Sequence, residues 1–188
     1  MNRRHLIPTT VALAVLAALG AGTAQAQDKF KIGLILPMTG PFASTGKQID
    51  AAVKLYMAQN GDMVAGKKVE VIVKDDTSAP DVTKRIAQEL VVNDKVNVLA
   101  GFGLTPLALA TAPIATQSKT PLVVMAAATS SITEASPFII RTSFTLPQAA
   151  VGMADWAPKN GIKKVVTLVS DYGPGIDAER YFNDRFLF

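Results

Sequence analysis

The sequence predicts an α/β fold built around a doubly wound, mainly parallel sheet. Short runs rich in Val, Ile and Leu alternate along the chain with segments of helical periodicity, a pattern typical of βαβ units. Hydrophobic residues make up 49% of the 188-residue chain, which is enough for a substantial core. Glycine and hydroxyl residues follow several of the apolar runs, so we expect polar loops at the ends of the strands.

The N-terminal segment, residues 1–26, has the features of a cleavable export signal. Arg3 and Arg4 give it a positive start, residues 6–19 are largely apolar, and Ala26 closes a small-residue cleavage pattern. The apolar part is shorter than the roughly 20 residues that span a bilayer. We therefore expect Sec-type export, cleavage after Ala26 and a periplasmic mature chain, with an uncleaved anchor or a twin-arginine route as alternatives.

Removal of this segment leaves few groups for catalysis. The only histidine, His5, is lost, the formal net charge falls from +4 to +2, and the chain has no cysteine. So small a net charge does not favour nucleic acid as a partner. Without His or Cys, the mature chain has no Ser-His or Cys-His pair and no zinc site of the usual kind. We predict no enzyme activity, no metal and no cofactor; a hydrolase that uses only Ser, Lys, Asp or Glu is the alternative.

The first strand is predicted at residues 30–36, and a helix follows it. Apolar residues recur at the i, i+3, i+4, i+7 and i+8 positions of that helix: Ile49, Ala52, Val53, Tyr56 and Met57. This spacing places them on one face, and Asn60-Gly61 then supplies residues that readily end a helix.

The second strand is predicted at residues 67–74 and leads directly to Asp75 and Asp76. A helical pattern of apolar residues begins just behind these carboxylates, at residues 82–90. Aspartate is a preferred helix cap, and no histidine is available as a partner for acid–base chemistry. We therefore expect the two aspartates to cap the helix.

Two further strands are predicted at residues 96–101 and 122–125, and a short apolar run at 138–141 follows. Between the first two of these, Thr105 and Pro106 have the pattern of a capping hydroxyl followed by proline in the first helical position. The predicted order of elements therefore continues the βαβ alternation.

The C-terminal part begins a new set of elements. Pro147 introduces a helix that reaches Gly161, a strand is predicted at residues 165–170, and a last helix begins near Ile176. Because the sequence stops at Phe188 without a following strand, we interpret this region as the opening of a second domain and expect a truncated chain.

Polar loops are expected wherever a predicted strand ends, at residues 39–46, 101–105, 126–131 and 171–175. A parallel sheet brings the carboxyl ends of its strands to one edge, so these loops can converge on one ligand. Their Ser and Thr hydroxyls and the free N–H groups at helix N-termini suit a carboxylate. We therefore expect a binding site for a small polar molecule at this edge.

Two aromatic residues in these loops have two interpretations each. Phe102 is expected to form a lid or wall of the site, and a place in the core is the alternative. Tyr172 is either an aromatic residue of a turn or a ring that lies over the ligand.

Motifs in a fixed order support a family resemblance: TGPFASTG at 39–46, DDTSAP at 75–80, AAAT at 126–129, IIRT at 139–142 and DYGPG at 171–175. Together with the export signal, they make the chain resemble the type I periplasmic substrate-binding proteins, specifically the leucine/isoleucine/valine-binding group that serves ABC importers. The resemblance implies two doubly wound lobes hinged around a ligand. Residues 27–145 would form the first lobe and residues 146–188 the start of the second.

The resemblance also implies site residues, with the ligand carboxylate held by hydroxyls and backbone N–H groups of the first lobe. By this likeness Thr105 and Thr129 would supply hydroxyls and Ala127 and Ala128 backbone groups. Thr45 would flank the ligand, and Tyr172 would close over it from the second lobe. The loop GFGLTP has one hydroxyl where the family has several, and Thr45 stands where an aromatic is frequent. These departures leave branched-chain amino acids, aromatic acids, other carboxylates and amides open as ligands.

The function implied by the resemblance is solute binding for an ABC uptake system for amino acids or related small carboxylates, with a membrane permease as partner. The alternatives are an extracytoplasmic sensor domain and a non-functional fragment. The family's acidic partner for an α-ammonium group would lie beyond Phe188. We therefore expect the chain alone to bind weakly or not at all.

Overall fold

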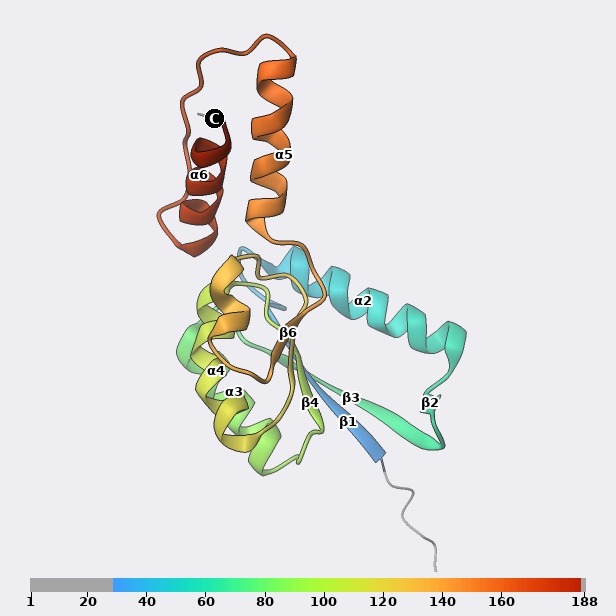
Figure 1. Ribbon diagram of the computed structural model, residues 1–188. Helices are drawn as coiled ribbons and strands as arrows, with labels where there is room; N and C mark the ends of the chain where they lie inside the picture. The colour runs from blue at the N-terminus through green and yellow to red at the C-terminus, as the bar shows by residue number, and fades with distance from the viewer. Residues whose placement is uncertain (1–28, 187–188) are drawn as a thin grey trace, which may run out of the picture.

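The computed structural model describes residues 29–186, which contain one six-stranded sheet with strand order β2-β3-β1-β4-β5-β6 (Figure 1). The strands are β1 (Lys29–Leu36), β2 (Met63–Val64), β3 (Lys67–Asp75), β4 (Val98–Gly101), β5 (Leu122–Val124) and β6 (Ile139–Arg141). All neighbouring strands pair in parallel except β2, which pairs antiparallel with β3. The predicted α/β fold with a mainly parallel sheet is confirmed, and the short strand β2 is an element that the sequence did not reveal.

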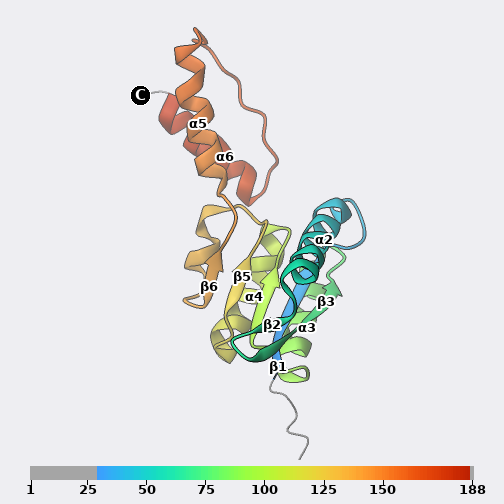
Figure 2. The same cartoon turned by 90° about the vertical axis from the view of Figure 1, so that its right-hand side faces the viewer.

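Helices cover both faces of the sheet, as a doubly wound fold requires. The helical elements are α2 (Ala43–Asn60), α3 (Pro80–Val92), α4 (Thr105–Ser118), the 3-10 helix η1 (Ser130–Glu134), α5 (Leu146–Lys159) and α6 (Gly173–Phe186). Side chains alternate across β1, so that Ile35 packs with α3 and α4, whereas Leu34 and Leu36 pack on the α2 side. In both views α5 and α6 lie side by side and extend away from the sheet (Figures 1 and 2).

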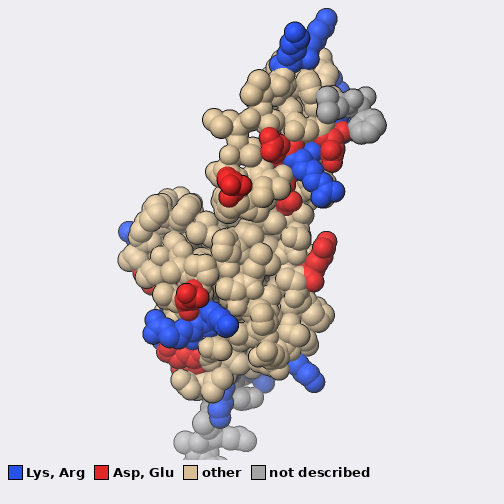
Figure 3. Space-filling view, turned by 90° about the vertical axis from the view of Figure 1, so that its left-hand side faces the viewer, with Lys and Arg blue, Asp and Glu red and all other residues tan. Residues whose placement is uncertain are grey.

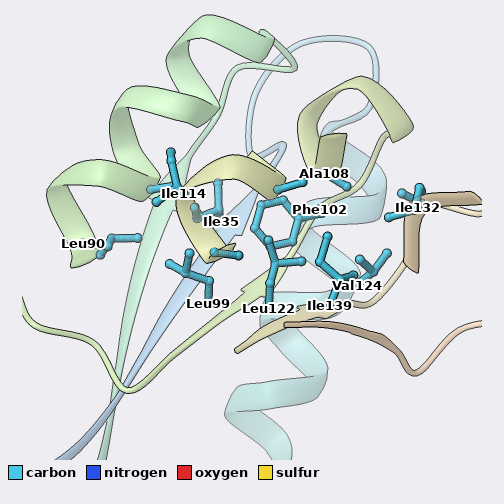
Figure 4. Packing of buried hydrophobic residues seen from close by; sticks show 14 of the residues in the cluster. Ile35, Leu90, Leu99, Phe102, Ala108, Ile114, Leu122, Val124, Ile132 and Ile139 are labelled. Atoms are coloured by element: carbon cyan, nitrogen blue, oxygen red, sulfur yellow. The ribbon is translucent and has the colours of Figure 1, made fainter. Parts of the chain in front are cut away.

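The larger part of the core lies between the sheet and helices α3 and α4. Figure 4 shows the ring of Phe102 in this cluster, close to Leu122 and Val124, and the side chain is 0% exposed. The expectation that Phe102 forms a lid or wall of a ligand site is therefore wrong for its side chain. A large apolar ring at the end of β4 gains more from burial in the core than from lining an open edge.

A tight turn after β4 brings the strand end to the carboxyl edge of the sheet. Gly101 and Phe102 both have left-handed backbone conformations, with φ of 115° and 64°. The Phe102 N–H donates to the Ile35 carbonyl at 3.0 Å, and the Phe102 carbonyl accepts from the Ala127 N–H, also at 3.0 Å. The turn therefore joins β1, β4 and the loop after β5 at one point.

The sequence-based expectations fail at one strand and two helix starts. Residues 165–170 are extended but pair with no strand in the described part of the chain, and Val166 and Leu168 are 94% and 98% exposed. A β-strand exists only through hydrogen bonds to a neighbour, and this segment has none beside it. The cap of α3 is Ala79 and that of α4 is Leu104, and neither makes a side-chain capping bond. Asp75, Asp76 and Thr105 are therefore not the caps that we expected.

The described helices include no membrane-spanning candidate: within residues 29–186, none combines sufficient length with sufficient apolar character.

The close approach at Gly101 provides a test of the turn. A Cβ at Gly101 would lie 2.1 Å from the Ile35 carbonyl oxygen, whereas one at Gly66, which also has a positive φ of 77°, meets nothing within 4 Å. We expect Gly66→Ala to lower the unfolding free energy by about 1 kcal/mol from backbone strain. Gly101→Ala should lower it by about 3 kcal/mol or more, because β1 and β4 must also move apart. Urea denaturation of both variants measures this, and equal losses would contradict the close approach.

Candidate ligand-binding site

The loop after β1 is tied to the end of β3 by Asp75. One carboxylate oxygen accepts hydrogen bonds from the N–H groups of Met38 and Thr77, both at 2.9 Å, and the other accepts from the Thr39 hydroxyl at 2.7 Å. Partial burial would raise the pKa of Asp75, but the hydrogen bonds from Thr39, Thr77 and Met38 together hold it below its ordinary value. Asp75 thus shapes the carboxyl edge of the sheet instead of capping α3.

The neighbouring Asp76 has the opposite electrostatics. It is 0% exposed; its Oδ1 accepts from the Ser78 N–H at 2.8 Å, and its Oδ2 has no hydrogen-bond partner in the described residues. Burial raises the pKa of this carboxyl above its ordinary value, and the hydrogen bond from Ser78 only partly offsets the effect. Two adjacent aspartates therefore differ because one is fully hydrogen-bonded and the other is not.

Two threonine hydroxyls meet at the same edge. Thr105 is the first residue of α4, Thr129 lies in the loop after β5, and their Oγ1 atoms are 2.7 Å apart. The side chains are nearly buried, at 4% and 6% exposure. The structure thus brings together two of the residues proposed to hold a carboxylate, and the hydroxyl that we expected to cap α4 is bonded to a residue 24 positions away.

The turn 171–175 reaches this threonine pair from the far end of the chain. A Cβ at Gly173, the first residue of α6, would lie 2.8 Å from Thr129 Oγ1 and 3.2 Å from Thr105 Cγ2. The backbone of Gly173 is therefore packed directly against both threonines. The adjacent Tyr172 is 39% exposed, so its side chain is only partly covered at this turn.

Arg141 and Asp177 complete the edge, and sequence reasoning missed both. The Arg141 guanidinium donates to the Thr129 carbonyl, and the Asp177 carboxylate accepts from the Ser130 N–H at 2.6 Å. Burial lowers the pKa of Arg141, while the negative charge of Asp177 acts in the opposite direction. Arginine retains its charge under such shifts, so a cation and an anion lie beside the loop that carries Thr129.

The remaining candidate residues contribute less than expected. The Ala127 N–H is bonded to Phe102, so the expectation that it serves a ligand is wrong, and the Ala128 carbonyl accepts from the Leu146 N–H at 3.0 Å. The Ala128 N–H has no hydrogen bond within the described residues and stays a candidate donor. Thr45 lies half-buried in the first turn of α2, with its N–H bonded to Phe42 and no described hydrogen bond to the threonine pair.

The rest of the described surface offers no competing polar site. Within residues 29–186, no cluster of three or more His, Cys, Asp or Glu side chains could hold a metal. A cavity of about 450 Å³ between α2 and the sheet is almost purely apolar, lined by residues such as Val53, Val71 and Met125. On the face shown in Figure 3, Lys and Arg side chains are interspersed with Asp and Glu and form no continuous basic stripe. The threonine pair is therefore the best candidate for polar recognition.

Comparisons with known proteins agree with this geometry. The sequence profile of the family described as periplasmic binding protein matches residues 29–186. The Leu/Ile/Val-binding protein homolog 6 of Brucella abortus is 47% identical over 178 residues, which cover 94% of this chain and 46% of that protein.

Solved structures give the same result. A solute-binding protein of an ABC transporter from Rhodopseudomonas palustris BisB5, in complex with 3,4-dihydroxybenzoic acid, is 67% identical with a TM-score of 0.83. Another from R. palustris HaA2, in complex with p-hydroxybenzoic acid, is 48% identical with a TM-score of 0.83. Each match covers 85% of this chain and 44% of the other, so the chain spans less than half the length of these relatives.

The two aspartates give a pH test with opposite signs. Because the folded-state pKa of Asp76 is raised, its favourable contribution is complete below the ordinary aspartate pKa of about 3.9 and is lost as pH rises through the folded value. Because that of Asp75 is lowered, its contribution is present above the ordinary value and is lost as pH falls through the folded one. We expect Asp76→Asn to become more stable relative to wild type as pH rises from acid to neutral, and Asp75→Asn to become less stable. Urea denaturation across this range measures both differences, and curves that run parallel for the two variants would contradict the assignment.

Proposed function

The chain belongs to the family of periplasmic binding proteins, and we propose that it acts in solute capture for an ABC uptake system, with hydroxylated benzoates as the ligand class. The single observation that carries the proposal is the Thr105–Thr129 hydroxyl pair, 2.7 Å apart, at the carboxyl edge of a parallel sheet. Ligands of open α/β sheets bind at this edge.

The chemistry around the pair favours a carboxylate. Thr105 is the first residue of α4, so the helix dipole adds positive potential to its hydroxyl. The Arg141 guanidinium, bonded to the Thr129 carbonyl, places a formal positive charge in the same loop cluster. Hydrogen bonds to an ionised acceptor are the strong ones, so two hydroxyls in a positive environment suit an anionic oxygen.

Two arguments favour an aromatic acid over an amino acid. The relative at 67% identity is described in complex with 3,4-dihydroxybenzoic acid, whereas the relative named for leucine, isoleucine and valine is 47% identical. An amino acid also brings an ammonium group that needs an acidic partner; the Asp177 carboxylate beside the pair is bonded to the Ser130 N–H, so an amino acid would need a further carboxylate, such as the one that the resemblance places beyond Phe188. A benzoate makes no such demand.

In this proposal each part of the chain has a role in transport. Residues 1–26 direct export and are cleaved after Ala26, residues 27–145 form the first lobe that captures the acid, and residues 146–188 begin the second lobe. Closure of two lobes excludes water from the ligand, and delivery to a membrane permease follows. No bond is made or broken, so the protein acts as a binder and not as an enzyme.

The ligand class is tested by thermal unfolding of the exported protein with both lobes present, in solutions of 3,4-dihydroxybenzoate, 4-hydroxybenzoate, leucine and benzamide, each at millimolar concentration. A ligand at about one hundred times its Kd adds about 2.7 kcal/mol to the unfolding free energy. We expect both hydroxybenzoates to raise Tm and leucine and benzamide to leave it unchanged. A shift with leucine alone, or with none of the four, would contradict the proposal.

The hydroxyl pair is tested by Thr129→Val. Loss of a hydrogen bond to a charged ligand should weaken hydroxybenzoate binding about tenfold or more. The matched control is Thr111→Val in α4, because the Thr111 hydroxyl is fully buried and bonded to the Leu107 carbonyl at 2.9 Å. Isothermal titration should detect the loss in the first variant alone. Equal affinities of the two variants would remove Thr129 from the site.

A further inference from the structure

The second turn of helix α6 is hydrogen-bonded to the segment that follows β5. Asp177 accepts a 2.6 Å hydrogen bond from the Ser130 N–H, across 47 residues of sequence. In the other side-chain hydrogen bonds of α6 within residues 29–186, Glu179 accepts from the Thr167 hydroxyl and Arg185 donates to Asp155, so both stay inside the C-terminal part. Asp177 is thus the polar link between α6 and the loop that carries Thr129.

We propose that Asp177 is a positioning residue of the binding site, which holds the turn 171–175 against the Thr105–Thr129 pair. Its importance for ligand binding rests on the proposed function, whereas its role in holding the turn does not. Asp177 lies four residues after Gly173, and residues four apart stack on one face of a helix. Fixing Asp177 on Ser130 therefore fixes the Gly173 backbone over the threonines, where a Cβ would already lie 2.8 Å from Thr129 Oγ1.

Arg141 adds a positive charge next to the Asp177–Ser130 hydrogen bond. Its Nε is buried without a hydrogen-bond partner in the described residues, and its guanidinium donates to the neutral Thr129 carbonyl. Asp177 is the carboxylate whose charge acts on this cation. Removing Asp177 therefore takes the acceptor from the Ser130 N–H and also removes a negative charge that favours the charged form of the Arg141 guanidinium.

The alternative is that α6 is held only by its packing against α5. The apolar residues that line the space between the two helices, among them Met153 and Phe182, belong entirely to the C-terminal part. This packing keeps α5 and α6 together, but none of it reaches Ser130. If it alone positioned α6, loss of the Asp177 carboxylate would free the Ser130 N–H but would not change the protection of the Ile176 amide, which is bonded to the Tyr172 carbonyl at 3.1 Å.

The test is amide hydrogen exchange of the ligand-free protein carrying Asp177→Ala or Asp177→Asn. We expect exchange of the Ile176 amide, which is bonded to the Tyr172 carbonyl in the turn, to rise about tenfold or more in D177A relative to the Leu99 amide, which is bonded inside the sheet to Pro121. The ratio of the two amides separates local release from global unfolding. D177N, which keeps an acceptor oxygen without the charge, should give an intermediate rise.

The matched control is Asp184→Ala in the same helix, because Asp184 is exposed and its ion pair is with Arg180 on α6 itself. D184A should leave the Ile176-to-Leu99 exchange ratio at the wild-type value. Equal ratios in D177A, D177N and D184A would overturn the proposal.

A second measurement connects the link to binding. Asp177 holds the turn against the threonines, so D177A should release 3,4-dihydroxybenzoate about tenfold faster than D184A in stopped-flow displacement. If wild-type protein binds none of the hydroxybenzoates, the proposed function fails while the exchange ratio still decides the role of Asp177. If the ligand binds and leaves both variants at the same rate, Asp177 has no role in retaining it.

Discussion

The turn at Gly101 and Phe102 is the constraint on which the site depends. A Cβ at residue 101 would lie 2.1 Å from the Ile35 carbonyl oxygen, so only glycine fits there. The next residue, Phe102, donates its N–H to the same carbonyl. The Phe102 ring is directed into the core while its carbonyl holds the loop after β5. This one turn therefore connects the apolar packing of the core to the placement of Thr105 and Thr129 at the carboxyl edge. It does so although a left-handed backbone conformation costs about 1–2 kcal/mol for a residue with a side chain such as Phe102.

The fold could be predicted from the sequence because its signal is local and repeated. Apolar runs at 30–36 and 67–74 became β1 and β3, and the helical spacing after them became α2 and α3. The prediction of a strand at 165–170 was wrong for a reason that cannot be found in the sequence of that segment. Whether an apolar extended segment forms a strand depends on a neighbour, and the segment pairs with none in the described residues.

The sequence predicted those parts of the candidate site whose position depends only on the order of strands and helices. Parallel strands bring their ends to one edge, so the meeting of Thr105 with Thr129 follows from the order of elements. Hydrogen-bond partners do not follow in this way. The rule that made Thr105 a helix cap considers only the next few residues, whereas its hydroxyl is bonded to the Thr129 hydroxyl 24 positions away. Arg141 and Asp177 were missed for the same reason, because their partners Thr129 and Ser130 lie 12 and 47 positions away in the sequence.

Polar groups that destabilise the fold are concentrated at the carboxyl edge of the sheet, where the candidate site lies. Of five buried polar atoms without a hydrogen-bond partner in the described residues, four lie at or just beyond strand ends: Asp76 Oδ2 and Ser78 Oγ after β3, Arg141 Nε in the last residue of β6, and Ser143 Oγ just beyond it. The fifth, Glu70 Oε2, is ion-paired with Lys29. Native proteins leave few such atoms, and each costs about 1–3 kcal/mol when it is truly unpaired. The core under α3 and α4, by contrast, is formed by apolar side chains. The apolar layer under α3 and α4 therefore stabilises the fold, whereas the unpaired polar groups at the carboxyl edge of the sheet destabilise it. This distribution is expected when the unpaired groups contact a bound molecule or a second packed layer.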